Sequence, residues 1–227
     1  MPLTGYGFRE WLTITVVAVA LAVAAALAGW WWAVGIVAVG WLALVSFFRD
    51  PIRRIPRDLP AGTMLSPADG TISAIEHLDW HEVTDSPAVV VRIFLSVLNV
   101  HVNRAPFDAV VRKIHYTPGK FLNAQTEASA RVNENNLMTL EIAGGERIGV
   151  RQISGMIARR IVCAVGENDR VDRGQKFGMI KFGSTAELIL PRPDDVEVHV
   201  EKGQRVQGGR TVLATLRMTD PGGEENA

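Results

Sequence analysis

The chain is short of cysteine and of excess charge. Cys163 is the single cysteine among 227 residues, so an internal disulfide is excluded, and no second cysteine stands at metal-ligand spacing. The 24 basic residues balance 24 acidic ones, which leaves no electrostatic field that would collect nucleic acid. Charge is missing altogether from residues 11–48. We therefore expect neither a disulfide scaffold nor a nucleic-acid-binding protein, and no metal site.

The uncharged segment is nearly twice the length that one helix needs to cross a bilayer. Gly29 and the tryptophans at positions 30–32 interrupt it near its middle, and tryptophan favours the headgroup level of a membrane. This pattern predicts a membrane anchor over residues 1–48, formed by two short apolar helices over 11–28 and 32–48 that fold as a hairpin. Each helix is slightly short for a full crossing, so a shallow re-entrant hairpin stays open as an alternative.

Basic residues flank the anchor unequally. Only Arg9 precedes it, whereas Arg49, Arg53, Arg54 and Arg57 follow directly. The positive-inside tendency places both ends of the hairpin, and the domain that follows, on the cytoplasmic side of the cell (inner) membrane. A cleaved signal peptide fits poorly because the apolar run is too long and has no basic n-region. A pair of helices buried in a soluble protein is the other alternative, and it fits poorly because so long an uncharged stretch is hard to shield from water without lipid.

Residues 49–227 are predicted to form a mostly β domain, a sandwich or barrel, because short Val- and Ile-rich segments alternate with Gly, Asp, Asn and Pro. The expected strands are residues 71–76, 88–95, 109–116, 138–143, 148–153, 160–165, 176–182, 187–190, 196–200 and 211–215. A weak repeat relates 171–176 to 206–211, each with a Val-x-x-Gly pattern. The two segments are similar to hairpins of lipoyl- and biotinyl-carrier domains, or they are ordinary turns in which glycine supplies a positive φ.

Gly183-Ser184-Thr185 lies between two predicted strands, where a plain hairpin turn would carry Asn-Gly or Asp-Gly. Glycine before serine lets the backbone bend until the hydroxyl approaches the preceding carbonyl carbon. Attack at that carbon converts the peptide bond to an ester, and β-elimination then opens the chain and leaves a residue that hydrolyses to a pyruvoyl group. This chemistry needs a base near Ser184 and donors for the oxyanion. A turn with capping hydroxyls is the simpler interpretation.

Two further segments could supply the base and its acid. The pattern of residues 95–106 predicts an apolar strand that runs into His101, Asn103 and Arg104. Polar residues are costly on a buried strand unless they bind something. Residues 65–71 contain Asp69 in an Asp-Gly turn, and Asp69 could orient and charge a histidine, as the acid of a Ser-His-Asp arrangement does. A polar segment over 118–124, followed by Ser129 and 133–135, could wrap a headgroup or merely connect two strands.

These motifs together resemble the short bacterial phosphatidylserine decarboxylase proenzymes. The similarity rests on FFRDP at 47–51, SPADG at 66–70, NVHVNR at 99–104, PGKFLNA at 118–124 and FGSTAEL at 182–188, in this order across nearly the whole chain. The resemblance implies self-cleavage between Gly183 and Ser184, driven by Asp69, His101 and Ser184. A β subunit (1–183) and an α subunit (184–227) would remain together, and the α subunit would begin with a covalent pyruvoyl cofactor derived from Ser184.

The resemblance further implies a carboxy-lyase that converts phosphatidylserine to phosphatidylethanolamine at the membrane surface, with His101 returning a proton to the substrate carbon. The arginines after the anchor could attract anionic lipid or serve topology alone. A homo-oligomer is expected, although no motif indicates it. Longer family members carry a second histidine where this chain has Arg104, so either His101 serves both steps or another residue, such as His115, takes one.

Two other classes of protein compete with this interpretation. A membrane-tethered carrier would need a lysine at a hairpin tip, and Lys176 and Lys202 lack the usual methionine flank. A membrane peptidase would explain serine, histidine and aspartate, but no G-x-S-x-G or zincin motif is present. His77 and His81 are four apart without a third ligand and are interpreted as exposed polar residues.

Overall fold

The computed structural model describes residues 2–122, 132–155, 160–181 and 184–218. Its contacts divide the chain into two units, Met1–Ile52 and Arg53–Ala227. The division falls four residues after the anchor boundary expected at residue 48, inside the arginine-rich stretch that follows the apolar segment.

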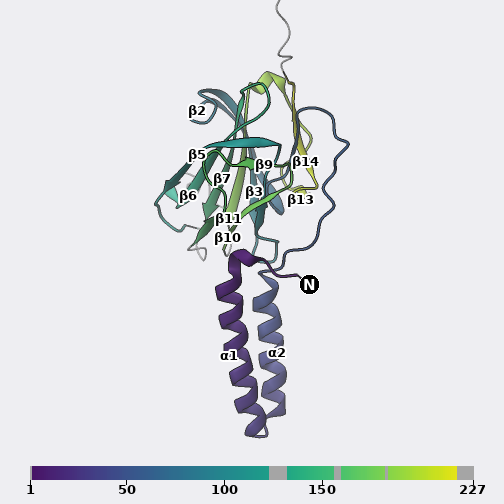
Figure 1. Ribbon diagram of the computed structural model, residues 1–227, viewed down its shortest axis with the longest axis vertical. Helices are drawn as coiled ribbons and strands as arrows, with labels where there is room; N and C mark the ends of the chain where they lie inside the picture. Colours follow the sequence, from purple (N-terminus) through teal and green to yellow (C-terminus); the bar gives the residue numbers. More distant parts are fainter. Residues whose placement is uncertain (1, 123–131, 156–159, 182–183, 219–227) are drawn as a thin grey trace, which may run out of the picture. The chain divides into compact units, whose positions relative to one another are not determined.

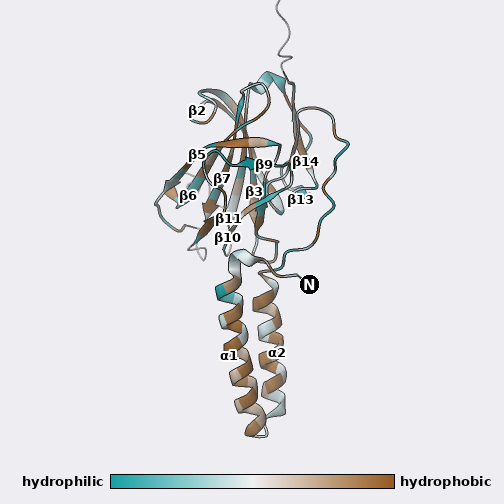
Figure 2. Cartoon of the chain, viewed as in Figure 1, coloured by the Kyte–Doolittle hydropathy of each residue, from teal (hydrophilic) through white to brown (hydrophobic). Residues whose placement is uncertain are grey.

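The N-terminal unit contains two antiparallel helices, α1 (Phe8–Leu27) and α2 (Trp31–Ser46), after a short 3-10 turn, η1 (Gly5–Gly7). The helices are joined at Gly29, whose φ of 77° is one that glycine adopts without strain. Figure 2 shows hydrophobic or near-neutral residues over both helices beyond the first turn of α1. The prediction of two apolar helices is confirmed, although α1 begins three residues before the expected start.

The two ends of this helical pair lie side by side. The Thr4 amide donates to the Phe48 carbonyl oxygen (2.8 Å), and the Asp50 amide donates to the Pro2 carbonyl oxygen (2.9 Å). Farther along, the Trp41 indole donates to the Thr15 hydroxyl (3.0 Å) and ties one helix to the other. At 1.5 Å per residue, α1 is long enough to cross the roughly 30 Å of bilayer hydrocarbon, whereas α2 is shorter.

The larger unit is built on an eight-stranded antiparallel sheet that curls on itself (Figure 1). From one edge to the other its strands are β13 (Arg205–Val206), β2 (Gly70–His81), β3 (Ser86–Leu95), β11 (Ser184–Pro191), β7 (Arg147–Ser154), β6 (Asn135–Glu141), β5 (Ala109–Thr117) and β9 (Arg170–Val171). Strand β11 lies near the centre, paired over its whole length with β3 and over most of it with β7.

Two three-stranded sheets complete this unit. One contains β4 (Val102–Arg104), β10 (Lys176–Ile180) and β8 (Ile161–Cys163). The other contains β1 (Thr63–Leu65), β14 (Val212–Leu216) and β12 (Val196–Val198), the last preceded by a 3-10 turn, η2 (Pro193–Asp195). All ten expected strands are present, and the prediction of a mostly β, sandwich- or barrel-like domain is confirmed. The strands not expected (β1, β4, β9 and β13) have two or three residues, too few to show alternation.

Alternation divides each long strand between two environments. On β11 the side chains of Ala186, Leu188 and Leu190 join the main core, together with Val150 of β7 and Ile93 of β3. The intervening residues point to the other face, where a smaller cluster includes Ile189 and Val90. Because Ser184 is in step with Ala186, its side chain belongs to the core-facing side of the sheet.

The two repeated Val-x-x-Gly segments are turns, and each carries the chain from one sheet to another. Gly174 and Gly209 have φ values of 79° and 72°, as the turn interpretation requires. They lie against each other, because a Cβ atom added at Gly209 would be 3.6 Å from the Gly174 Cα. Ile55 packs on both glycines, so the segment after the arginines is fixed over this pair of turns.

Candidate active site

Ser184 is the first residue of β11 and is fully buried. Leu95 of β3 stands opposite it on one side and Ser154 of β7 on the other. Its hydroxyl has no hydrogen-bond partner among the described residues. A buried hydroxyl in that condition costs about 1–3 kcal/mol, so its retention in a core position indicates a chemical use.

His101 lies just before β4 and is also fully buried. Its carbonyl oxygen accepts from the Ile180 amide (3.3 Å), which continues the pairing of β4 with β10. Its ring Nδ1 lies 3.0 Å from the Asn99 carbonyl oxygen. Because a carbonyl oxygen only accepts, Nδ1 carries the proton of the neutral ring, and Nε2 holds the lone pair. The neutral ring therefore presents its basic nitrogen on the side away from Asn99.

The small sheet that contains β4 contacts the core-facing side of the large sheet beside Ser184. The Gln152 Nε2 group, on β7, donates to Asn103 Oδ1 of β4 (2.9 Å) and to the Val162 carbonyl oxygen of β8 (3.3 Å). His101 is two residues from Asn103, and Ser154 is two residues from Gln152, both toward the end of the sheet where Ser184 lies. The segment that holds His101 therefore lies on the core-facing side of the large sheet, the side that also carries Ser154 and Ser184.

The chain between β3 and β4 differs from the expected continuous strand. Strand β3 ends at Leu95, and the Asn99 side chain then accepts from both the amide (2.9 Å) and the hydroxyl (2.8 Å) of Ser96. The prediction of one strand from Leu95 into His101 is thus wrong, because asparagine offers the backbone a local turn in place of a ladder. This turn carries the chain from the sheet that holds Ser184 to the sheet that faces it.

Asp69 lies between β1 and β2 and is nearly buried. Its carboxylate accepts from both terminal nitrogens of Arg53 (2.5 and 2.6 Å) and from the Gly208 amide (2.8 Å). A bidentate pair of this kind fixes the position and orientation of the carboxylate. The described contacts of Asp69 are thus with a guanidinium and a backbone amide, and its expected role as the acid that orients His101 stays a prediction.

Two other predicted parts of the site are Gly183 and the polar segment that begins at residue 118, and only part of that segment is described. Gly183 and residues 123–131 lie outside the described residues. The described start of the polar segment is tied to the site through Asn133, whose Nδ2 donates to the carbonyl oxygens of Leu122 (2.9 Å) and Ser154 (2.8 Å). The described part of the PGKFLNA motif is thus joined, at Leu122, to the strand end that faces Ser184.

Sequence reasoning missed the polar residues of β6 and β7 that share this face. Asn136 and Gln152 face each other across the two strands, and Asn136 Nδ2 donates to Gln152 Oε1 (3.2 Å). Ser154 follows on the same side and is fully buried. The available signal was alternation, since Gln152 and Ser154 stand in step with Ile148 and Val150, which are core residues.

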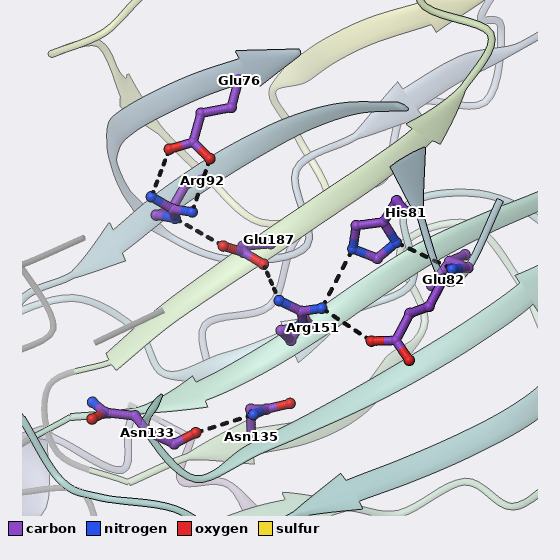
Figure 3. A network of polar contacts seen from close by, with 9 residues as sticks. Glu76, His81, Glu82, Arg92, Asn133, Asn135, Arg151 and Glu187 are labelled. Atoms are coloured by element: carbon purple, nitrogen blue, oxygen red, sulfur yellow. Dashed lines mark hydrogen bonds and ion pairs between the residues drawn. The ribbon is translucent and has the colours of Figure 1, made fainter. Parts of the chain in front are cut away.

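The opposite face of the same strands carries a ladder of charges (Figure 3). Glu187 of β11 accepts from Arg92 Nε of β3 (2.8 Å) and from Arg151 Nη1 of β7 (3.3 Å). Arg92 also donates to both carboxylate oxygens of Glu76 (2.9 and 3.2 Å). Burial lowers the pKa of Arg92, but its pairing with Glu187 and Glu76 outweighs burial and raises that pKa above the usual value. Charge pairing thus joins the three central strands three residues from Ser184.

Comparison with known proteins agrees with the motif pattern. A family model described as phosphatidylserine decarboxylase matches residues 42–214. A "phosphatidylserine decarboxylase proenzyme" of Rhodopirellula baltica is 42% identical over 94% of this chain and 88% of its own length. Proteins of the same description from Carboxydothermus hydrogenoformans (41% identical, 92% of this chain and 96% of the relative) and Magnetococcus marinus (40%, 80% and 80%) are also similar.

Proposed function

The chain belongs to the phosphatidylserine decarboxylase family, and we propose that it is a proenzyme that cuts itself before Ser184 and then converts phosphatidylserine to phosphatidylethanolamine. The observation that carries the proposal is the buried Ser184 hydroxyl without a partner among the described residues, on the side of the sheet that the segment with His101 and Asn103 contacts through Gln152. No ordinary structural role accounts for a hydroxyl in that place.

In the self-cleavage, His101 Nε2 would take the proton of the Ser184 hydroxyl as its oxygen attacks the carbonyl carbon of Gly183. The peptide bond breaks as the ester forms, and the amino group of residue 184 is released. Loss of the Cα proton then expels the Gly183 carboxylate, and water replaces the nitrogen of residue 184 as ammonia. The products are the β subunit (1–183) and the α subunit (184–227), whose first residue is a pyruvoyl group.

The residues around Ser184 fit such a group. Asn103 Nδ2 and Ser154 Oγ are buried and lack hydrogen-bond partners among the described residues, so donors for a group bound on this side of the sheet are present. The pyruvoyl group would supply an electron sink for the bond that breaks as carbon dioxide leaves. His101 would hold the proton that the substrate carbon takes up. Asp69 would act in the cut from its position beside Arg53.

The N-terminal helices would hold the enzyme at its substrate, a two-chain lipid that stays in the bilayer. Helix α1 is long and apolar enough to cross a membrane, which supports membrane association. Arginines follow α2 while only Arg9 lies near the start of α1, and this imbalance supports a cytoplasmic position for the larger unit. We place the protein in the cell membrane on these grounds.

The test is an intact mass of the full-length protein purified from membranes, followed by an assay on phosphatidylserine. Two fragments are expected, the smaller with a blocked pyruvoyl residue in place of Ser184. Ser184→Ala should stay uncut, whereas Ser73→Ala, a matched hydroxyl deletion on β2, should be cut like the wild type. A wild-type chain that stays whole and equals Ser184→Ala after long incubation would refute the proposal and leave a tethered binding domain.

A further inference from the structure

Two buried donors on the side of the sheet that carries Ser184 lack acceptors among the described residues. Asn103 and Ser154 are both 0% exposed, and neither Asn103 Nδ2 nor Ser154 Oγ has a hydrogen-bond partner there. Buried donors without acceptors are rare in folded proteins, because burial removes their hydrogen bonds to water and no protein acceptor replaces them. Ser154 stands directly opposite Ser184 on the neighbouring strand, so at least one of these donors is next to the reacting residue.

The orientation of the Asn103 amide is set by its neighbours. Gln152 Nε2 faces the Val162 carbonyl oxygen (3.3 Å), which can only accept, so the nitrogen of Gln152 must be on that side. The same nitrogen faces Asn103, so the Asn103 atom that meets it is the oxygen (2.9 Å). Asn136 Nδ2 donates to the remaining Gln152 oxygen (3.2 Å) and supports the same assignment. The Asn103 Nδ2 group is therefore directed away from Gln152, with both of its protons available.

The position of this donor follows from the strand registers. Asn103 contacts Gln152, which is two residues from Ser154 on β7, a separation of about 7 Å along a strand. Both donors therefore lie on the side of the sheet that carries the Ser184 side chain. Two neutral donors on that side suit an acceptor with two oxygens.

We propose that Asn103 and Ser154 form a subsite for the carboxylate of the substrate's serine headgroup. The proposal rests on the proposed function, in which the headgroup amine reacts at residue 184. The headgroup's acceptors are its carboxylate and its phosphate diester. The carboxylate shares a carbon with the amine, whereas the phosphate is one carbon and one oxygen farther away. The acceptor nearest to residue 184 is thus the carboxylate.

The neutral character of both donors suits this reaction. A carboxylate about to leave as carbon dioxide loses its charge, and a close ion pair would stabilise it before the reaction more than during it. A neutral amide and a neutral hydroxyl orient the carboxylate while stabilising the substrate's ground state less than a charged partner would. They also discriminate phosphatidylserine from its product, which lacks the carboxylate.

The experiment compares two variants in full-length enzyme in mixed micelles. Asn103→Asp keeps an oxygen for Gln152 and removes the Nδ2 donor, and Ser154→Ala removes only the unpartnered hydroxyl. Asn135→Asp, the same change on a β6 residue that faces the other side of the sheet, is the control. The readouts are the extent of self-cleavage by intact mass, kcat/KM for phosphatidylserine, and the inhibition constant of phosphatidylethanolamine.

Both variants should cut themselves fully, and kcat/KM should fall about 10- to 100-fold in each, the range for a lost hydrogen bond to a charged group. Inhibition by phosphatidylethanolamine should stay within about twofold of the wild type, whereas general damage to the site would weaken it in parallel. Ser154→Ala should keep the melting temperature of the wild type. Its kinetics therefore test the subsite even if Asn103→Asp does not fold.

Three outcomes would overturn the subsite: unchanged kcat/KM in Ser154→Ala, a parallel loss of phosphatidylethanolamine inhibition, or variants that fold but stay uncut, which would place these donors in the cleavage step. Failure of the proposed function shows differently, since the wild type itself would then not cut or not decarboxylate.

Discussion

Glu187→Gln tests whether the charge ladder holds β11 in place. Glu187 is 1% exposed and is bonded on one side to Arg92 and on the other to Arg151 (Figure 3). Glutamine keeps the shape of the side chain but has one acceptor oxygen, so its amide nitrogen must face one of the two guanidinium groups. One arginine then loses its acceptor on β11, and its N–H donors face the N–H donors of the glutamine amide in a buried site.

The size of the effect follows from burial. Removing one partner of a buried ion pair costs about 3–5 kcal/mol, and because Arg92 keeps Glu76 we expect the lower end, about 3 kcal/mol. Glu76→Gln breaks a bond to the same arginine from β2, but the Glu76 side chain is 35% exposed. An exposed pair contributes about 1 kcal/mol or less, so this matched variant should be much milder.

The assay is chemical unfolding of the full-length protein in detergent, followed by circular dichroism of the sheet, with hydrogen exchange of the β11 amides as a local measure. Glu187→Gln should unfold at clearly lower denaturant and exchange faster near Ser184, whereas Glu76→Gln should stay close to the wild type. Equal midpoints for the two variants would refute the reasoning, because burial of Glu187 would then add nothing.

Two further changes test other parts of the structure. Burial and the nearby Arg151 lower the pKa of His81 from 6.5 to about 4, so the stability due to its neutral form should be complete above pH 6.5 and fall as the pH drops toward 4. Melting temperatures across this range should decline less in His81→Asn, and an equal decline would contradict the assignment. Gly178→Ala would place a Cβ atom 2.1 Å from the Val162 carbonyl oxygen, so β8 and β10 must separate and both stability and self-cleavage should drop. Gly166→Ala, whose Cβ atom would meet only an ordinary contact at 3.7 Å, is the control, and an equal effect of the two would contradict the steric argument.

Local pattern was sufficient for much of this molecule. The uncharged run predicts the two helices because length and apolarity alone decide that structure. Period-two alternation predicts the long strands, and Ser184 is recognisable because a Gly-Ser-Thr triplet between strands is unusual. Failures occur where a side chain changes the local backbone, as Asn99 does when it turns the chain after β3.

Long-range partners were not predictable from one sequence. The sequence suggests that the charge of Arg53 sets topology or attracts lipid, yet in the structure Arg53 binds Asp69 in a bidentate pair. Nothing in the local pattern joins these residues, since the pairing depends on how the segment after α2 lies against the turn at Gly209. The relay from Asn136 through Gln152 to Asn103 likewise connects two sheets, and only the fold brings its members together.

The structure describes all five histidines of the chain, and their positions bear on which of them could share the proton transfers with His101. His77 and His115 are exposed on β2 and β5, and His199 contacts the Thr215 hydroxyl. His81 lies in the charge ladder on the far face and is buried, so the expectation that it is exposed is wrong. Arg104 stands at the position for which the resemblance implies a second histidine in longer family members, and its Nη1 donates to the Gly174 carbonyl oxygen (2.9 Å). A guanidinium does not lose its proton near neutral pH, so Arg104 cannot replace an imidazole as a base. Under the proposed function, we therefore infer that His101 is the histidine that serves the proton transfers, first from Ser184 in the cut and later to the substrate carbon.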